Sequence, residues 1–130
     1  METITDFMNG FFACRNTEEE LYLKSRESFR QKFYTNDCLW DSRFGTLEMN
    51  KSEAVVLVEE SESEARVITN HRFQFRAVAT EFRLRYHLEL RNNNWIIRRV
   101  ESECPACRGA GDNSCIICGG KHWLPGTLDK

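Results

Sequence analysis

The C-terminal part of the sequence contains four cysteines whose spacing is typical of a zinc site. They form two Cys-x-x-Cys pairs, Cys104 with Cys107 and Cys115 with Cys118, and seven residues separate the pairs. A two-residue gap lets both thiolates of a pair reach one ion at about 2.3 Å, and two pairs complete a tetrahedron. We therefore predict one structural Zn²⁺ ion bound by these four side chains, with no open coordination position for catalysis.

Other uses of these cysteines fit the rest of the sequence less well. Disulfides are typical of secreted proteins, whereas residues 1–7 lack a basic stretch followed by an apolar one, so we expect a cytoplasmic protein. A redox Cys-x-x-Cys usually begins a helix in a βαβ context, which is not predicted here. An iron–sulfur cluster also uses four cysteines, but the glycines that follow each pair favour zinc. His122 is a reserve ligand, and we expect Cys14 and Cys38 to be small buried residues.

Length and composition indicate a single globular core. The chain has 130 residues, of which 41% are hydrophobic and 29% charged. No window approaches the roughly 18 apolar residues of a membrane span. The net charge of -2 conceals an asymmetry, because residues 1–64 hold 14 acidic and 7 basic side chains, whereas residues 65–100 hold 8 arginines and two glutamates. We therefore expect a basic surface on the second half of the domain, within a protein too acidic overall for general nucleic-acid affinity.

Two amphipathic helices are predicted at the N-terminus. The first has its apolar side chains at offsets 0, 3, 4, 7 and 8, namely Ile4, Phe7, Met8, Phe11 and Phe12. The second is predicted from about Glu18 to Tyr34, because Thr17 and Glu20 have the spacing of a capping box. The following residues, Asn36 to Asn50, show no clear period.

The rest of the domain reads as antiparallel strands. From Phe82 to Leu90 every even residue is apolar and every odd one is charged or titratable, which predicts a central strand with one buried face. We place the beginning of this strand near Gln74 and a turn at Asn92–Asn94, where asparagine tolerates positive φ. The other predicted strands are Ala54–Val58, Ala65–Phe73 and Trp95–Val100. Helices followed by about four strands indicate an α+β class.

This order of elements, with a long Arg/Tyr-rich strand, an Asn-rich turn and Trp95-x-Ile97, resembles the nuclear-transport-factor-2-like superfamily, which includes ketosteroid isomerases and polyketide cyclases. The resemblance covers residues 1–102 and implies a cone-shaped, cystatin-like fold with the N-terminal helices packed on a bent sheet. Residues 103–130 resemble the zinc region of DnaJ-type proteins, with His122 in place of the last glycine. We expect these residues to form a zinc-binding tail that packs on the first domain through Trp123.

Enzymes of this superfamily place a carboxylate, tyrosine or histidine inside the cone, where burial tunes the pKa. The candidates for such a pocket are Tyr34, Asp37, Asp41, His71 and Tyr86. No Asp or Glu falls at an inward position of the predicted strands. A small-molecule isomerase, cyclase or hydrolase that uses the cone is therefore our second interpretation, and a nucleic-acid-binding zinc protein is the third.

The preferred interpretation is a non-catalytic protein- or ligand-binding domain with a structural zinc site, similar to the immunity proteins of polymorphic toxin systems. Arg83, Arg85 and Arg91 share the outward register of the long strand and form the predicted interaction surface. The expected partner is an acidic protein or a second copy of the chain in a homodimer, and the cone could also hold a small ligand. Alternatively, these arginines form cross-strand ion pairs with carboxylates such as Glu59, Glu60 or Glu101.

Overall fold

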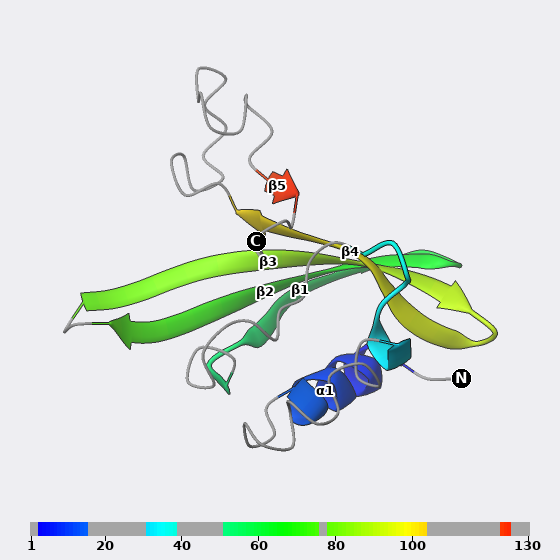
Figure 1. Cartoon of the computed structure of the whole chain (residues 1–130), viewed down its shortest axis with the longest axis horizontal. Helices are drawn as coiled ribbons and strands as arrows, with labels where there is room; N and C mark the ends of the chain where they lie inside the picture. The colour runs from blue at the N-terminus through cyan, green and yellow to red at the C-terminus, as the bar shows by residue number, and fades with distance from the viewer. Residues whose placement is uncertain (1–2, 16–30, 39–50, 76–77, 104–122, 126–130) are drawn as a thin grey trace.

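The computed structural model describes residues 3–15, 31–38, 51–75, 78–103 and 123–125, and it has an α+β architecture. One helix and five strands follow one another, namely α1 (Ile4–Arg15), β1 (Ala54–Glu60), β2 (Glu64–Phe75), β3 (Val78–Arg91), β4 (Asn94–Glu103) and β5 (Trp123–Pro125). The strands form one antiparallel sheet in the order β1-β2-β3-β4-β5. Helix α1 lies along one face of this twisted sheet (Figure 1). We call the face toward α1 the inner face and the opposite one the outer face.

The central strand is β3, as the alternating pattern predicts, and it lies between β2 and β4. Leu84, Tyr86 and Leu88 are buried, whereas Arg83 is exposed. The expected beginning of this strand is wrong, because Gln74 belongs to β2 and pairs with Ala79, and β3 begins at Val78. The apolar positions change from odd numbers up to Phe75 to even numbers from Phe82, and the prediction missed this break in the pattern.

The β3–β4 hairpin confirms the predicted turn. Asn92 and Asn93 have φ angles of 51° and 66°, a region that asparagine tolerates better than most residues. The pairing of β3 with β4 shifts register after His87, which pairs with Arg99, while Leu88 pairs with Ile97. This bulge leaves both Ile97 and Val100 buried, and it brings the following Glu101 to the outer face beside Arg85.

Helix α1 buries the stripe that its period predicts. Thr3 precedes the helix, and its hydroxyl accepts a hydrogen bond of 3.0 Å from the Asp6 backbone N–H. The Phe11 ring makes edge contacts with Phe33, Tyr34 and Tyr86 at centroid distances of 5.4, 5.9 and 5.7 Å. These contacts join the helix to the inner face of the sheet and form the centre of the core.

The second predicted helix falls mostly outside the described residues. Residues 31–33 are helical, and Tyr34 then forms a parallel bridge with Ile97 of β4. The Thr35 backbone N–H donates a hydrogen bond of 2.8 Å to the Ile97 carbonyl, so this segment lies beside β4 in the manner of a short neighbouring strand. Within the part of the chain that the structure describes, no helix has the length and apolar character needed to cross a membrane.

Strand β5 adds a fifth strand to the four that the sequence predicts. Trp123 pairs with Glu103, and Pro125 pairs with Glu101, along the edge of β4. Trp123 therefore returns to the sheet, as expected for the tail. The four predicted zinc ligands and His122 lie outside the described residues, so the proposed boundary of a separate tail at residue 103 stays a prediction.

Candidate functional site

A cluster of buried polar side chains surrounds Glu53 on the inner face of the sheet. The Glu53 carboxylate accepts hydrogen bonds from Arg15, from Thr69 and from the Tyr86 hydroxyl, the last at 2.7 Å. His71 Nε2 lies 3.2 Å from Glu53 Oε1. The side chains of Arg15 and Glu53 are fully buried. We call these five residues the Glu53 cluster.

Three elements and one connecting residue position this cluster. Arg15 is in the last turn of α1, four residues after Phe11 and therefore on the same buried stripe. Thr69 and His71 occupy alternate positions of β2 and thus share its inner face, while Tyr86 comes from β3. Glu53 immediately precedes β1. Its carboxylate therefore lies where the helix end meets the first two strands.

The charges of the cluster stabilise one another. Burial alone would raise the pKa of Glu53, but the hydrogen bond from His71 and the nearby Arg15 guanidinium outweigh it and lower this pKa to about 2. Burial and the Glu53 charge raise the pKa of Tyr86 well above its ordinary value. Burial opposes the charged form of Arg15, but Glu53 more than compensates and raises the pKa of Arg15. Glu53 is therefore ionised at neutral pH, and Tyr86 keeps its proton.

This arrangement is poorly suited to general acid–base catalysis. A catalytic base works best with a pKa near the operating pH, whereas that of Glu53 is about 2. Each carboxylate oxygen already contacts two donors: Arg15 and His71 at Oε1, Thr69 and Tyr86 at Oε2. A carboxylate occupied in this way can hold the helix end against the sheet, which is a structural use of buried charge.

The predicted pocket residues separate into three groups. His71 and Tyr86 contact Glu53, and Tyr34 is buried beside Phe11 on the same face. Asp37 does not join them, because it is exposed and accepts a hydrogen bond of 2.7 Å from the Thr35 hydroxyl. That hydrogen bond lowers the pKa of Asp37. Asp41 lies outside the described residues.

Sequence reasoning missed three members of the cluster, Glu53, Arg15 and Thr69. A signal existed for Arg15, because it continues the apolar stripe of α1 with i, i+4 spacing after Phe11. Thr69 falls at an inward position of a predicted strand, where a hydroxyl needs a partner when buried. Nothing in the local pattern distinguishes Glu53 from the exposed glutamates that follow it at the end of β1.

On the outer face, three basic side chains converge on Glu101. Arg85 Nη2 lies 2.7 Å from this carboxylate and Arg99 Nη2 lies 2.9 Å from it, and His87 Nε2 contacts it at 2.5 Å. Burial lowers the pKa of His87 despite its hydrogen bond to Glu101. Burial opposes ionisation of Glu101, but the hydrogen bonds from His87 and Arg85 outweigh it and lower the Glu101 pKa. The group therefore keeps a positive excess at neutral pH, since two arginines face one carboxylate.

Trp123 of β5 covers part of this charged group. The Arg85 guanidinium lies over the indole ring, 4.6 Å from its centroid. A cation over an indole face is attracted by the quadrupole of the ring, and Arg85 is only 21% exposed in this position. The tail thus contacts the outer face at one of the three arginines that form the predicted interaction surface.

The three arginines of the predicted interaction surface differ in their surroundings. Arg85 pairs with Glu101 across β3 and β4, as the alternative interpretation expects. Arg91 pairs with Glu89 at 2.7 Å within its own strand. Arg83 is exposed, and among the described residues no carboxylate lies within ion-pair distance of it. The outer face therefore combines paired and unpaired cations.

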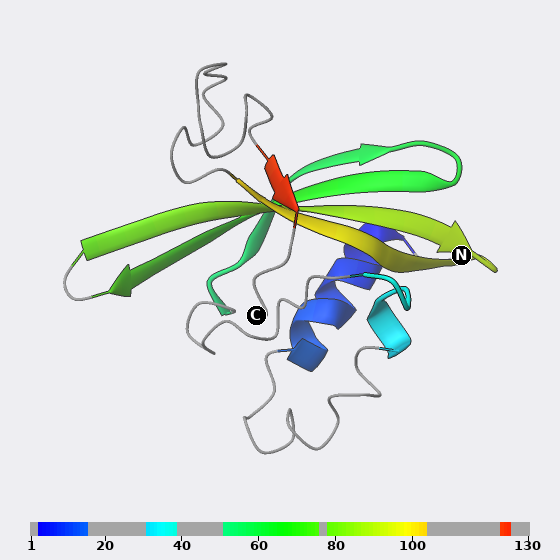
Figure 2. The ribbon, with the colours of Figure 1, turned by 45° about the horizontal axis from the view of Figure 1, so that its top comes forward.

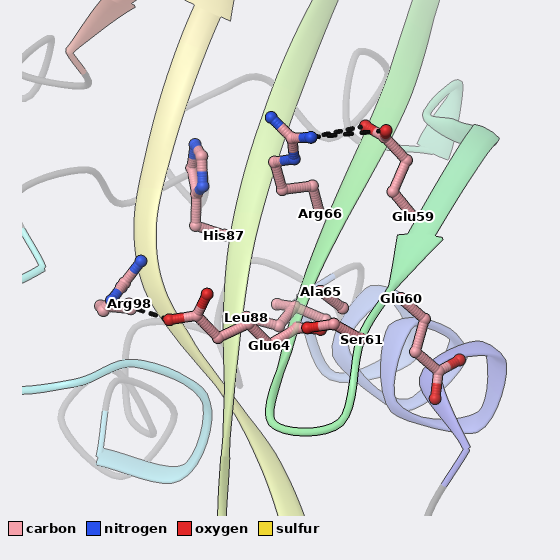
Figure 3. Close-up of a pocket in the computed structure, with 9 residues that line it drawn as sticks. All are labelled: Glu59, Glu60, Ser61, Glu64, Ala65, Arg66, His87, Leu88 and Arg98. Carbon is pink, nitrogen blue, oxygen red and sulfur yellow. Dashed lines mark hydrogen bonds and ion pairs between the residues drawn. The ribbon is translucent and has the colours of Figure 1, made fainter.

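A surface groove of about 460 Å³ lies beside the β1–β2 turn (Figure 3). Its lining combines both charge signs, and two ion pairs account for much of it: Arg66 with Glu59 at 3.4 Å and Arg98 with Glu64 at 3.6 Å. Figure 3 shows Arg66, His87 and Arg98 among the side chains that line it. Because these charges are paired and largely solvated, the groove has no concentrated charge of one sign.

Within the described ranges, no group of three or more His, Cys, Asp or Glu side chains is arranged to hold a metal ion. The candidate metal ligands remain Cys104, Cys107, Cys115 and Cys118, which are outside those ranges.

The sequence matches no family model and no curated protein. A comparison of folds found the crystal structure of an NTF-2-like protein of unknown function from Shewanella oneidensis MR-1. The two chains are 11% identical, and the match covers 73% of this chain and 94% of that chain with a TM-score of 0.41. This degree of likeness assigns no residue role to the present chain.

Proposed function

We propose that this chain is a non-catalytic binding domain with a nuclear-transport-factor-2-like fold, extended by a structural zinc module. The observation that carries this proposal is the saturation of Glu53 by Arg15, Thr69, His71 and Tyr86. Glu53 is a buried carboxylate of the inner face, and its pKa of about 2 suits a structural anchor better than a proton acceptor. An interaction protein that captures a charged partner, as immunity proteins do, is the functional class that fits this description.

The outer face is the proposed binding surface, and an acidic protein is the proposed partner. Arg83 is exposed there, and Arg85 and Arg99 together exceed the charge of Glu101. Charged surfaces of this kind increase association rates and select partners of opposite sign. A small ligand in the cone is less well supported, because both oxygens of the Glu53 carboxylate already contact two donors each.

Binding of poly-L-glutamate, measured by fluorescence anisotropy at low and high salt, tests this surface. We expect binding that weakens as salt rises and that Arg83→Glu reduces, since exposed charges are screened beyond about 8 Å at physiological ionic strength. Lys32→Glu is the matched control, because Lys32 is also an exposed cation but belongs to segment 31–38, which lies beside α1 (Figure 1). Equal loss in the two variants, or no binding by the wild type, contradicts the proposed surface.

The non-catalytic assignment has a separate test in the titration of Glu53. Carbon-13 NMR of the side-chain carboxyl should show no transition near neutral pH, because its pKa is about 2. A Glu53 pKa between about 6 and 7 would instead match a general base and would favour an enzyme. Tyr86→Phe supplies the control, since removal of one hydrogen-bond donor should raise the Glu53 pKa.

The zinc module is proposed from the spacing of Cys104, Cys107, Cys115 and Cys118. A short segment with few apolar residues cannot form a core by itself, and metal binding supplies about 10 kcal/mol or more in small zinc modules. Its role would be to hold the chain between β4 and β5 so that Trp123 reaches Arg85. Metal analysis of protein purified without added metal should find about one zinc ion per chain. Metal-free protein with these cysteines in disulfides contradicts it.

A further inference from the structure

Strand β1 exposes an apolar edge that the proposed function does not use. Its central residues Val55, Val56, Leu57 and Val58 are 39%, 54%, 48% and 41% exposed. Strand β1 stands first in the strand order, and among the described strands only β2 pairs with it. Figure 2 shows the end of β1 running along the outer margin of the β1–β2 hairpin. Its other edge therefore presents backbone groups and β-branched side chains together.

Such an edge is one that proteins normally protect. Lysines, prolines, short strands and bulges are the usual devices that prevent one edge from pairing with another. Residues 54–60 contain no lysine and no proline, and the strand has seven residues. Its protection is limited to a register irregularity between Val55 and Leu57 and to two glutamates, Glu59 and Glu60, at its end. The composition thus favours pairing with another strand.

A groove beneath the same edge adds a second observation. It has a volume of about 310 Å³ and lies between α1 and β1, with Ile4, Met8 and Phe12 on the helix side and Val55 and Val58 on the strand side. Its apolar lining is thus continuous with the exposed edge. A strand added beside β1 would place further side chains over the open side of this groove.

We propose that β1 pairs with β1 of a second copy of this chain, in antiparallel orientation, to form a continuous sheet across a homodimer. Charge selects this occupant and this orientation. Lys51 precedes β1, whereas Glu60 and Glu62 lie at and beyond its end. A two-fold axis near the middle of β1 places Lys51 of each copy opposite the acidic end of the other, and a parallel arrangement would instead bring like charges together.

The two-fold axis has a further consequence for the groove. In an antiparallel pair of strands the inner faces of both copies lie on the same side of the sheet. The second copy therefore presents its own Val55 and Val58 on the side of α1, next to the groove that these residues line in the first copy. The pairing satisfies the exposed backbone and covers the apolar groove at once.

Sedimentation equilibrium of the full chain tests the proposal. We expect a dimer, and Leu57→Lys should weaken it about tenfold or more, because a charge on an edge strand opposes pairing. Asn94→Lys adds the same charge at an exposed position of β4 and should leave the dimer unchanged. Far-UV circular dichroism checks that both variants are folded. A monomeric wild type, or a dimer that tolerates Leu57→Lys, overturns the proposal.

The orientation has its own test in a charge exchange. Lys51→Glu and Glu60→Lys should each weaken the dimer roughly two- to fivefold, and the double variant should recover it. Amide hydrogen exchange of residues 54–60 should slow as protein concentration rises. If Arg83→Glu disrupts the dimer and Leu57→Lys does not, the chain associates with itself through the outer face. That result overturns pairing through β1. The poly-L-glutamate measurement remains independent of both outcomes, so failure of the edge pairing is distinguishable from failure of the proposed binding surface.

Discussion

Replacement of Glu53 by glutamine removes the charge of the buried cluster while it keeps the shape of the side chain. The Arg15 guanidinium then stays fully buried and loses its ion pair with Glu53. Removal of one partner from a buried ion pair typically costs about 3–5 kcal/mol, because the other charge is left uncompensated. Unfolding free energies of single domains are about 5–15 kcal/mol. We therefore expect Glu53→Gln to lose a large fraction of the stability of this domain.

The pH dependence of stability gives an independent magnitude. The pKa of Glu53 falls from 4.5 to about 2 in the folded chain, a difference that corresponds to roughly 3 kcal/mol. Because the folded pKa is the lower one, this stabilisation is complete above the unfolded value and is lost as pH falls from about 4.5 toward about 2. Glu53→Gln has no carboxyl to titrate at this position, so its stability should change less with pH over that range.

Urea unfolding followed by far-UV circular dichroism, repeated between pH 7 and acid pH, measures both effects. The difference between wild type and Glu53→Gln isolates the cluster, because protonation of the cysteine segment affects both proteins alike. Glu62→Gln is the control, since Glu62 is exposed and its substitution should stay within about 0.5 kcal/mol. The additional change Arg15→Met should recover part of the loss by removing the buried guanidinium that has lost its ion pair with Glu53. A Glu53→Gln protein as stable as the wild type at pH 7 would refute the reasoning.

Three further outcomes follow from the packing and the cysteine spacing. Leu88→Ala should lower the free energy of unfolding in urea by about 2–5 kcal/mol, because the side chain is 1% exposed. Arg83→Ala should lower it by less than about 1 kcal/mol, and the reverse order would mean that the faces of β3 are exchanged. Asn93→Val should lower the melting temperature, since a β-branched residue resists a φ of 66°, and Asn93→Gly should not. Cys107→Ser should lose the proposed metal and increase quenching of Trp123 fluorescence by acrylamide; zinc retained at one equivalent would contradict the proposed site of four cysteines.

Features that depend on neighbouring residues were readable from the sequence. The alternation from Arg83 to Leu90 predicted which side chains of β3 are buried, because successive side chains of a strand point to opposite faces. The helical period of α1 and the turn at Asn92–Asn93 are local in the same sense. The beginning of β3 had a local signal that the prediction missed, since the apolar positions change from odd to even numbers between Phe75 and Phe82.

The tertiary structure alone decided which charges are buried and which apolar strand is not. Arg15 and Tyr86 are 38 and 33 positions from Glu53 in the sequence, and they meet only because α1 docks against the inner face of the sheet. In the sequence alone, a glutamate next to Ala54 is indistinguishable from a solvated charge, since local hydrophobicity carries no information about distant partners. The β-branched run of β1 likewise suggests burial, and its exposure comes from its place at the sheet margin. Strand order depends on pairing between distant segments, so it cannot be predicted from the composition of one segment.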